Sequence, residues 1–291
     1  CTNRFRQEVA KRAKHSVGTI ASTLGYSRQN VYKQQKDSAT KSLKLDSVKK
    51  LVDRERKQLP RIGTRKVYYL IKEDLRLQGL KFGRDKLFEL MRIYGLQIRP
   101  RRRYTQTTMS KHWLRKWPNL IKSKRANHQD EVWVSDITYI KTEQGNCYLN
   151  MITDAYSRKI MGYALADNME TESMIKALNM AVVQRENPLV STIHHSDRGL
   201  QYCSKEYASM TAKNNIKLSM TENGDPYENA LAERMNRTIK EEFGMDRKMK
   251  NKQQVQKLVE ESIFLYNHKR PHLALRMKTP DQVYNKKIPA T

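Results

Sequence analysis

Three acidic residues in the second half of the chain have the type and spacing that could hold metal ions. Asp136 lies within one apolar segment, Asp197 follows a second, and Glu233 comes later, with 35 residues between it and Asp197. Carboxylate ligands without cysteine select Mg²⁺, for which Mn²⁺ can substitute. Three clustered carboxylates repel one another. Two ions about 3.5–4 Å apart would relieve that repulsion and clamp the attacking and leaving oxygens of a phosphoryl transfer.

The segment around Glu233 is predicted to be a helix over residues 225–240. Asp225 suits the N-cap, Pro226 fits the first turn, Glu228 completes a capping box, and Phe243-Gly244 marks the end. At 100° per residue, one face is apolar and the other carries a carboxylate among amides and cations. The polar face comprises Asn229, Glu233, Asn236, Arg237 and Lys240. The alternative interpretation is a solvent-exposed face with a Glu233–Arg237 ion pair.

Strand and helix patterns place these acidic residues in an α/β sheet domain. Three segments are rich in β-branched and aromatic residues and are separated by turn residues: 132–140, 147–153 and 160–165. A helix over 170–186, a strand over 190–195, a helix over 204–214 and a strand over 216–220 follow. The order predicts a mixed five-stranded sheet flanked by helices. If the first and fourth strands are neighbours, Asp136 and Asp197 approach each other.

Charge divides the chain into two parts. The whole chain has 57 basic and 30 acidic side chains, a net charge of +27. Residues 1–130 hold 34 of the basic and 10 of the acidic residues, whereas the remainder is nearly neutral. The first part is therefore expected to bind the phosphates of a polyanion such as double-stranded DNA, and the binding should weaken with salt.

The first part contains two predicted two-helix units and a basic tether. Helices over 16–24 and from Ser27 onward, separated by Gly25, predict a helix-turn-helix, although an ordinary αα-corner is the alternative. A second unit joins helices over 64–75 and 84–94 through Gly79, and residues 99–125 form a cationic segment with interleaved aromatic residues. The candidate DNA contacts in these elements are Arg28, Gln29, Asn30, Lys33, Arg84, Lys86, Arg101, Arg102, Arg103 and Lys116.

The predicted domain boundaries follow these changes. They are 1–58 for the N-terminal helix-turn-helix region, 59–98 for the second unit, 99–128 for the basic linker, 129–245 for the catalytic core and 246–291 for a helical extension. Cys1, Cys147 and Cys203 form no CxxC pair, which argues against a disulfide framework or a cysteine zinc site. No apolar run is long enough to span a membrane, so a cytoplasmic location is expected.

Three longer sequence motifs identify a family more specifically than the spacing of the acidic residues does. HHSDRGLQY (194–202), DPYENALAERMNRTIKEE (225–242) and YNHKRPHLALRMKTPDQVY (266–284) resemble the second-reading-frame product of the IS3 family of bacterial insertion sequences. The resemblance covers essentially the whole chain. Asp136, Asp197 and Glu233 then match the DDE site of transposases related to retroviral integrases.

This resemblance implies an RNase H-like core with two Mg²⁺ ions, which nicks the inverted-repeat ends of an element and joins the 3′-OH to DNA. It implies that Lys240, seven residues beyond Glu233, contacts transposon-end DNA. It further implies a copy-out, circle and paste-in pathway, a self-associated multimer that pairs two ends, and a first-reading-frame partner fused by frameshifting. Two other classes stay open: a repressor with an inactive core, and an RNase H-like nuclease without end specificity.

Several further residues near these motifs have less distinctive patterns. His194 and His195 are expected to pack at a strand end, and Asp154 is expected to be structural. Arg158 and Lys159 are candidate contacts for target DNA. The segment 266–272 is expected to brace the core, with some contact to phosphates.

Overall fold

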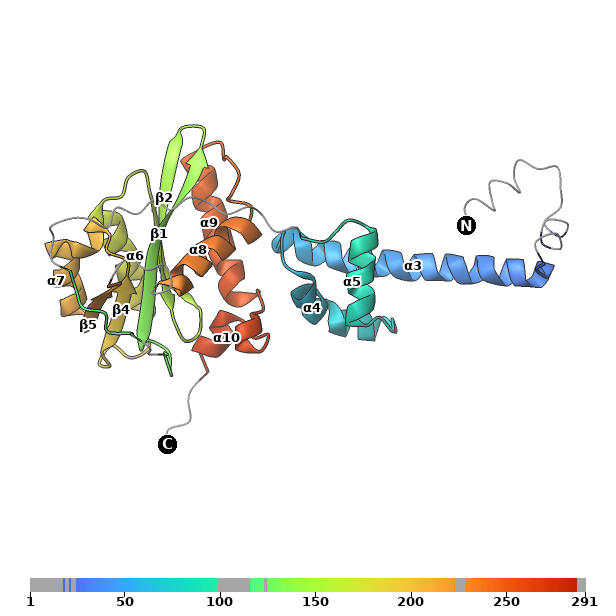
Figure 1. The fold of residues 1–291 in the computed structure, drawn as a ribbon, viewed down its shortest axis with the longest axis horizontal. Coiled ribbons are helices and arrows are strands. Elements are labelled where there is room, and N and C mark those ends of the chain that lie inside the picture. The colour runs from blue at the N-terminus through green and yellow to red at the C-terminus, as the bar shows by residue number, and fades with distance from the viewer. Residues whose placement is uncertain are drawn as a thin grey trace.

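The computed structural model describes Gly18, Ala21 and residues 25–98, 116–122, 125–222 and 229–286. A helical unit of α3 (Arg28–Gln58), α4 (Thr64–Leu77) and α5 (Arg84–Ile93) lies beside an α/β core. The N-terminal half of α3 projects away from both (Figure 1). Within these described segments, no helix combines the length and apolarity needed to cross a bilayer.

Five strands form one mixed sheet in the order β3-β2-β1-β4-β5. Tight turns make β1 (Val132–Thr142), β2 (Gly145–Asp154) and β3 (Ile160–Ala166) an antiparallel series. Helical crossovers return β4 (Thr192–Ser196) and β5 (Ile216–Met220) parallel to β1. The predicted mixed five-stranded sheet is confirmed, and the first and fourth strands are neighbours in it, which is the condition for Asp136 and Asp197 to approach each other.

Helices cover both faces of this sheet. Successive side chains along each strand point to opposite faces, and apolar side chains lie on both. Met151 packs in one hydrophobic cluster with α8 (Ala230–Glu242) and α9 (Lys252–His268), whereas the neighbouring Ile152 packs in another. That second cluster includes α6 (Thr171–Gln184), η1 (Leu200–Cys203) and α7 (Lys205–Lys213). An antiparallel trio of strands extended by two parallel strands, between helical layers, is the predicted RNase H-like fold.

The first helical region differs from the prediction. Ser27 caps α3 as expected, accepting a hydrogen bond from Asn30 N over 3.2 Å, and Gly25 turns with φ +72°. However, α3 then continues for 31 residues instead of ending as a short recognition helix. No Gly or Pro interrupts residues 28–58, so the polar middle of this segment stays helical. Most of the predicted first helix, 16–24, lies outside the described residues, so the helix-turn-helix stays a prediction.

The helix that carries Glu233 begins later than predicted, at Ala230 rather than near Asp225. Asp225, Pro226 and Glu228 lie outside the described residues. Asn229 occupies the N-cap position without a side-chain cap, and its Nδ2 donates to the carbonyl of Ser135 over 3.0 Å. The predicted end is correct: Phe243 is the C-cap, and Gly244 adopts φ +79°.

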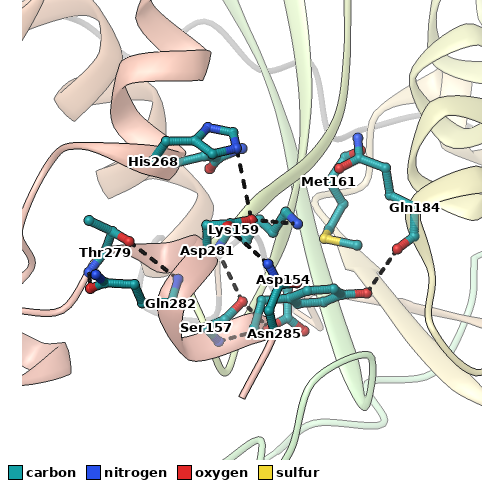
Figure 2. A network of polar contacts seen from close by, with 12 residues as sticks. Asp154, Ser157, Lys159, Met161, Gln184, His268, Thr279, Asp281, Gln282 and Asn285 are labelled. Carbon is teal, nitrogen blue, oxygen red and sulfur yellow. Dashed lines mark hydrogen bonds and ion pairs between the residues drawn. The ribbon is translucent and has the colours of Figure 1, made fainter. Parts of the chain in front are cut away.

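The C-terminal segment closes against the turn between β2 and β3. It contains η2 (Leu273–Leu275) and α10 (Pro280–Tyr284). Figure 2 shows Lys159 directed at Asp281, a 3.0 Å ion pair, beside the buried Asp154 that accepts hydrogen bonds from Ser157. This confirms the structural role of Asp154. The ion pair with Asp281 disfavours Lys159 as a contact for target DNA, because the Lys159 side chain is only 11% exposed and already paired.

Candidate active site

The sheet register brings Asp136 and Asp197 to one place. In the parallel pair of β1 and β4, Val134 lies opposite His195. Asp136 lies two residues after Val134, within β1, and Asp197 lies two residues after His195, just beyond the end of β4. The two strands run in the same direction, so both residues are displaced the same way. Neighbouring strands are about 4.8 Å apart, so these carboxylates emerge side by side at the end of β4.

The ionisation of Asp136 reflects this crowding. Its burial raises its pKa to about 7, and repulsion from Asp197 and, more weakly, Glu233 adds to the effect. Hydrogen bonds from Asn236 Nδ2 (2.8 Å) and from the backbone N–H of Ile137 (2.9 Å) oppose it. Glu233 lies in the first turn of α8, the helix that packs on β1 and β2. Burial raises its pKa, Arg237 opposes the rise, and Asp197 adds repulsion. The three carboxylates therefore interact pairwise.

Three interacting carboxylates are suitable ligands for a hard divalent cation, because the cation would offset the repulsion between them. The described residues nevertheless contain no set of three His, Cys, Asp or Glu side chains already arranged to hold an ion. Local hydrogen bonds hold two of the carboxylates: Asp197 Oδ1 accepts from Gly199 N over 3.1 Å, and Asp136 Oδ1 accepts from Ile137 N over 2.9 Å.

Asn236 is the residue of this site whose role the sequence did not single out. It follows Glu233 by three positions on the same face of α8, is 5% exposed, and donates to Asp136. Asn229, one turn before Glu233, is equally buried against β1. The Oδ1 atom of each is buried without a hydrogen-bond partner. The face of α8 that bears Glu233 therefore packs largely on β1, although Arg237 on the same face is exposed.

The cations of α8 have different environments. Lys240 Nζ donates to the Tyr139 carbonyl over 2.7 Å and to Thr138 Oγ1 over 3.2 Å, and it lies over the Tyr139 ring. Its burial lowers its pKa. Arg237, in contrast, is exposed beside Glu233. Of the two, Arg237 is exposed, whereas Lys240 is partly buried against β1, and its contact with DNA stays a prediction. The burial of Asn229 likewise disfavours it as a DNA contact.

The remaining candidate DNA contacts lie far from the carboxylates along the chain. Those that the structure describes are exposed, in the first turns of α3 and α5 and at the end of the tether: Arg28, Gln29, Asn30, Lys33, Arg84, Lys86 and Lys116. Arg101, Arg102 and Arg103 lie outside the described residues.

The two histidines before Asp197 support the sheet, as predicted. His194 contacts the Tyr207 hydroxyl through Nε2 over 3.2 Å, and His195 contacts Ser219 Oγ through Nδ1 over 2.9 Å. Both rings are fully buried. Burial, together with the adjacent His195, lowers the pKa of His194 to about 3, so His194 is neutral.

Comparisons with known proteins agree with this architecture. Two family models described as integrase core domain match residues 126–226 and 214–280. The insertion element IS600 uncharacterized 31 kDa protein of Shigella sonnei is 34% identical over 220 residues, which is 75% of this chain and 79% of that protein. Transposase InsF for insertion sequence IS3fB of Escherichia coli K12 is 32% identical over 171 residues, 58% of this chain and 59% of InsF.

Among solved structures, the magnesium complex of the HTLV-2 integrase catalytic core domain is similar at a TM-score of 0.45 and 19% identity, covering 55% of this chain and all of that one. The family matches and the sheet together define an integrase-type core, a class of polynucleotidyl transferase. More narrowly, the chain belongs to the IS3 family of insertion-sequence transposases, which are of the DDE type and related to retroviral integrases.

Proposed function

We propose that this chain is a Mg²⁺-dependent DNA transposase whose catalytic residues are Asp136, Asp197 and Glu233. It binds the inverted-repeat ends of its insertion sequence, nicks them by hydrolysis, and joins the liberated 3′-OH to a second DNA site by transesterification. The observation that carries this proposal is the register of β1 and β4, which sets Asp136 beside Asp197, together with the electrostatic repulsion between Glu233 and each of these two carboxylates. Family membership supports the same assignment.

The three carboxylates are the residues that would hold the metal, as two Mg²⁺ ions or with Mn²⁺ in their place. Bound ions would polarise the scissile phosphodiester and activate the attacking oxygen. The protein's own contribution is placement. β1 and β4 fix two carboxylates on a rigid sheet, and α8 brings the third, with Asn236 orienting Asp136 by its hydrogen bond.

The basic half of the chain supplies the DNA-binding surface in this proposal. Exposed cations in the first turns of α3 and α5 fit contacts with the phosphates of the terminal repeats, and Arg237 fits a contact near the scissile bond. The segments 1–58, 59–98 and 99–128 would serve as end-recognition units and tether, 129–245 as the catalytic core and 246–291 as its brace. A multimer would pair two ends, a partner fused by frameshifting would join the chain, and transposition would proceed by the copy-out, circle and paste-in pathway.

A strand-transfer assay tests the proposal. Oligonucleotides that carry the terminal repeats are incubated with Mg²⁺ and either the wild type or Asp197→Asn. The wild type is expected to nick and join, whereas Asp197→Asn is expected to bind with unchanged affinity and to do neither. Binding without nicking by the wild type would favour a repressor. Cutting without end specificity or joining would favour a simple nuclease.

A further inference from the structure

The C-terminal end of α8 is capped by a residue from the helical unit. The last carbonyls of a helix have no partner within the helix and need donors from elsewhere. Arg61, in the loop between α3 and α4, provides two. Its backbone N–H donates to the Glu242 carbonyl over 3.2 Å, and its Nη1 donates to the Glu241 carbonyl over 3.4 Å. A cation at this end also complements the helix dipole.

Ion pairs surround this cap. Arg61 pairs with Asp246 at 3.6 Å, and Lys66 of α4 pairs with Glu242 at 3.3 Å. Arg270 donates from Nε and Nη2 to the same Glu242 carboxylate, each over 2.6 Å. Although burial alone would raise the pKa of Glu242, Arg270 and Lys66 lower it overall, which keeps Glu242 ionised. Two elements distant in sequence thus converge on the last residue of α8.

An apolar contact lies behind these charges. Leu59 and Ile62, on either side of Arg61, are 2% and 0% exposed. They belong to the same hydrophobic cluster as Phe243 and Met245, the residues that follow α8. On the other side, Lys269 at the end of α9 pairs with Glu55 of α3 at 2.9 Å and contacts Gln58. The helical unit is therefore docked on the catalytic core at α8, and it is more than a module on a tether.

We propose that Arg61 is a positioning residue for Glu233, through which the helical unit sets the placement of the catalytic helix. This inference rests on the proposed role of Glu233. α8 is a single helix of 13 residues, and Glu233 precedes Glu242 by about 14 Å along it, at about 1.5 Å per residue. Holding the C-terminal end of α8 therefore holds the carboxylate at its other end against β1. DNA bound to the helical unit would act on the active site through this junction.

Hydrogen exchange and nicking, measured on the full chain, test this inference. Arg61→Ala removes the Glu241 contact and the Asp246 ion pair, and a loss of this size is expected to speed exchange of amides 240–246 about fivefold to tenfold. Nicking is expected to fall about tenfold, while affinity for end DNA stays within about twofold. Arg61→Lys keeps the charge without the planar fork and is expected to recover part of both losses.

Arg65→Ala is the matched control, because Arg65 is an exposed cation four residues away in the same unit. It is expected to leave exchange in α8 unchanged. Unchanged exchange in Arg61→Ala, or equal losses of nicking in Arg61→Ala and Arg65→Ala, would overturn the positioning role. The exchange measurement uses DNA-free protein. It therefore tests the cap even if the wild type shows no nicking, a result that would reject the proposed function instead.

Discussion

Asn236 donates a hydrogen bond from Nδ2 to Oδ2 of Asp136 over 2.8 Å, and this contact joins the helix of one proposed metal ligand to the strand of another. The bond also opposes the rise in the pKa of Asp136 that burial and Asp197 cause. Because Asn236 is almost fully buried, the geometry of its amide is fixed by packing. The residue thus orients a carboxylate without belonging to the acidic set.

Replacing Asn236 with Ala should lower nicking by about 10- to 100-fold, the usual cost of removing a group that orients a metal ligand. Binding to end DNA should not change, since the side chain is buried. Nicking rates at saturating DNA would measure the first effect and a binding titration the second. Thr238→Ala, on another face of α8, serves as the control. Nicking within about twofold of the wild type would show that the contact has no role in orienting Asp136.

The sheet could be predicted from the sequence because its information is local. Segment 132–140 is rich in β-branched and aromatic residues, which favour a strand, and the charge change near residue 130 coincides with the start of the sheet. The polar face of α8 was also predictable from its angular spacing. Asn236 and Glu233 do lie together there, and Asn236 reaches β1 as that face packs on the sheet.

The features that could not be predicted from the sequence depend on contacts between residues far apart in the chain. Asp225 suited the N-cap of α8 by its type, but the helix starts later, and Asn229 at its N-cap position donates to Ser135, 94 residues away. Lys159 looked like a free cation in a turn until Asp281 paired with it. The cap from Arg61 to Glu242 spans the helical unit and the core. Local patterns contain no information about such partners.

Gly162 marks a place where β3 and α6 approach too closely for any side chain. A Cβ atom at this position would lie 2.0 Å from the Ala177 carbonyl oxygen and 2.9 Å from Ala181 N. Gly162→Ala should therefore destabilise the core by about 3 kcal/mol or more, because backbone must move. Gly83→Ala is the control, since a Cβ atom at Gly83 would meet nothing within 4 Å and the φ of this residue is −84°. Chemical denaturation of both variants would decide, and equal stabilities would refute the close approach.

His272 should make the fold sensitive to acid. Arg270 Nη1 donates to His272 Nε2 over 2.6 Å, so this nitrogen must be unprotonated. Burial and the charges of Arg270, Lys66 and Arg158 lower the pKa of His272 to about 2. As pH falls below about 6.5, His272 takes up a proton in the unfolded chain but not in the folded protein. The free energy of unfolding therefore falls by up to about 1.4 kcal/mol per pH unit.

The variant His272→Gln should lose stability less steeply than the wild type between pH 6.5 and 4.5, because its side chain does not titrate. Thermal or urea unfolding across this range would measure the difference. Identical slopes for the wild type and His272→Gln would mean that His272 takes up its proton over the same pH range in the folded and unfolded states.

The cations at the start of α5 should contribute to DNA binding through phosphate contacts. Arg84 and Lys86 are both exposed in the first turn of this helix. Each phosphate contact adds about 0.9 to the slope of log affinity against log salt, so Arg84→Ala with Lys86→Ala should reduce the slope by about 2. The fall in affinity should be similar for specific and unrelated duplexes, since phosphates carry no base identity. Lys176→Ala removes an exposed cation of α6 and should leave the slope unaltered. If the double variant kept the full slope, the phosphate-binding surface would lie elsewhere than on α5.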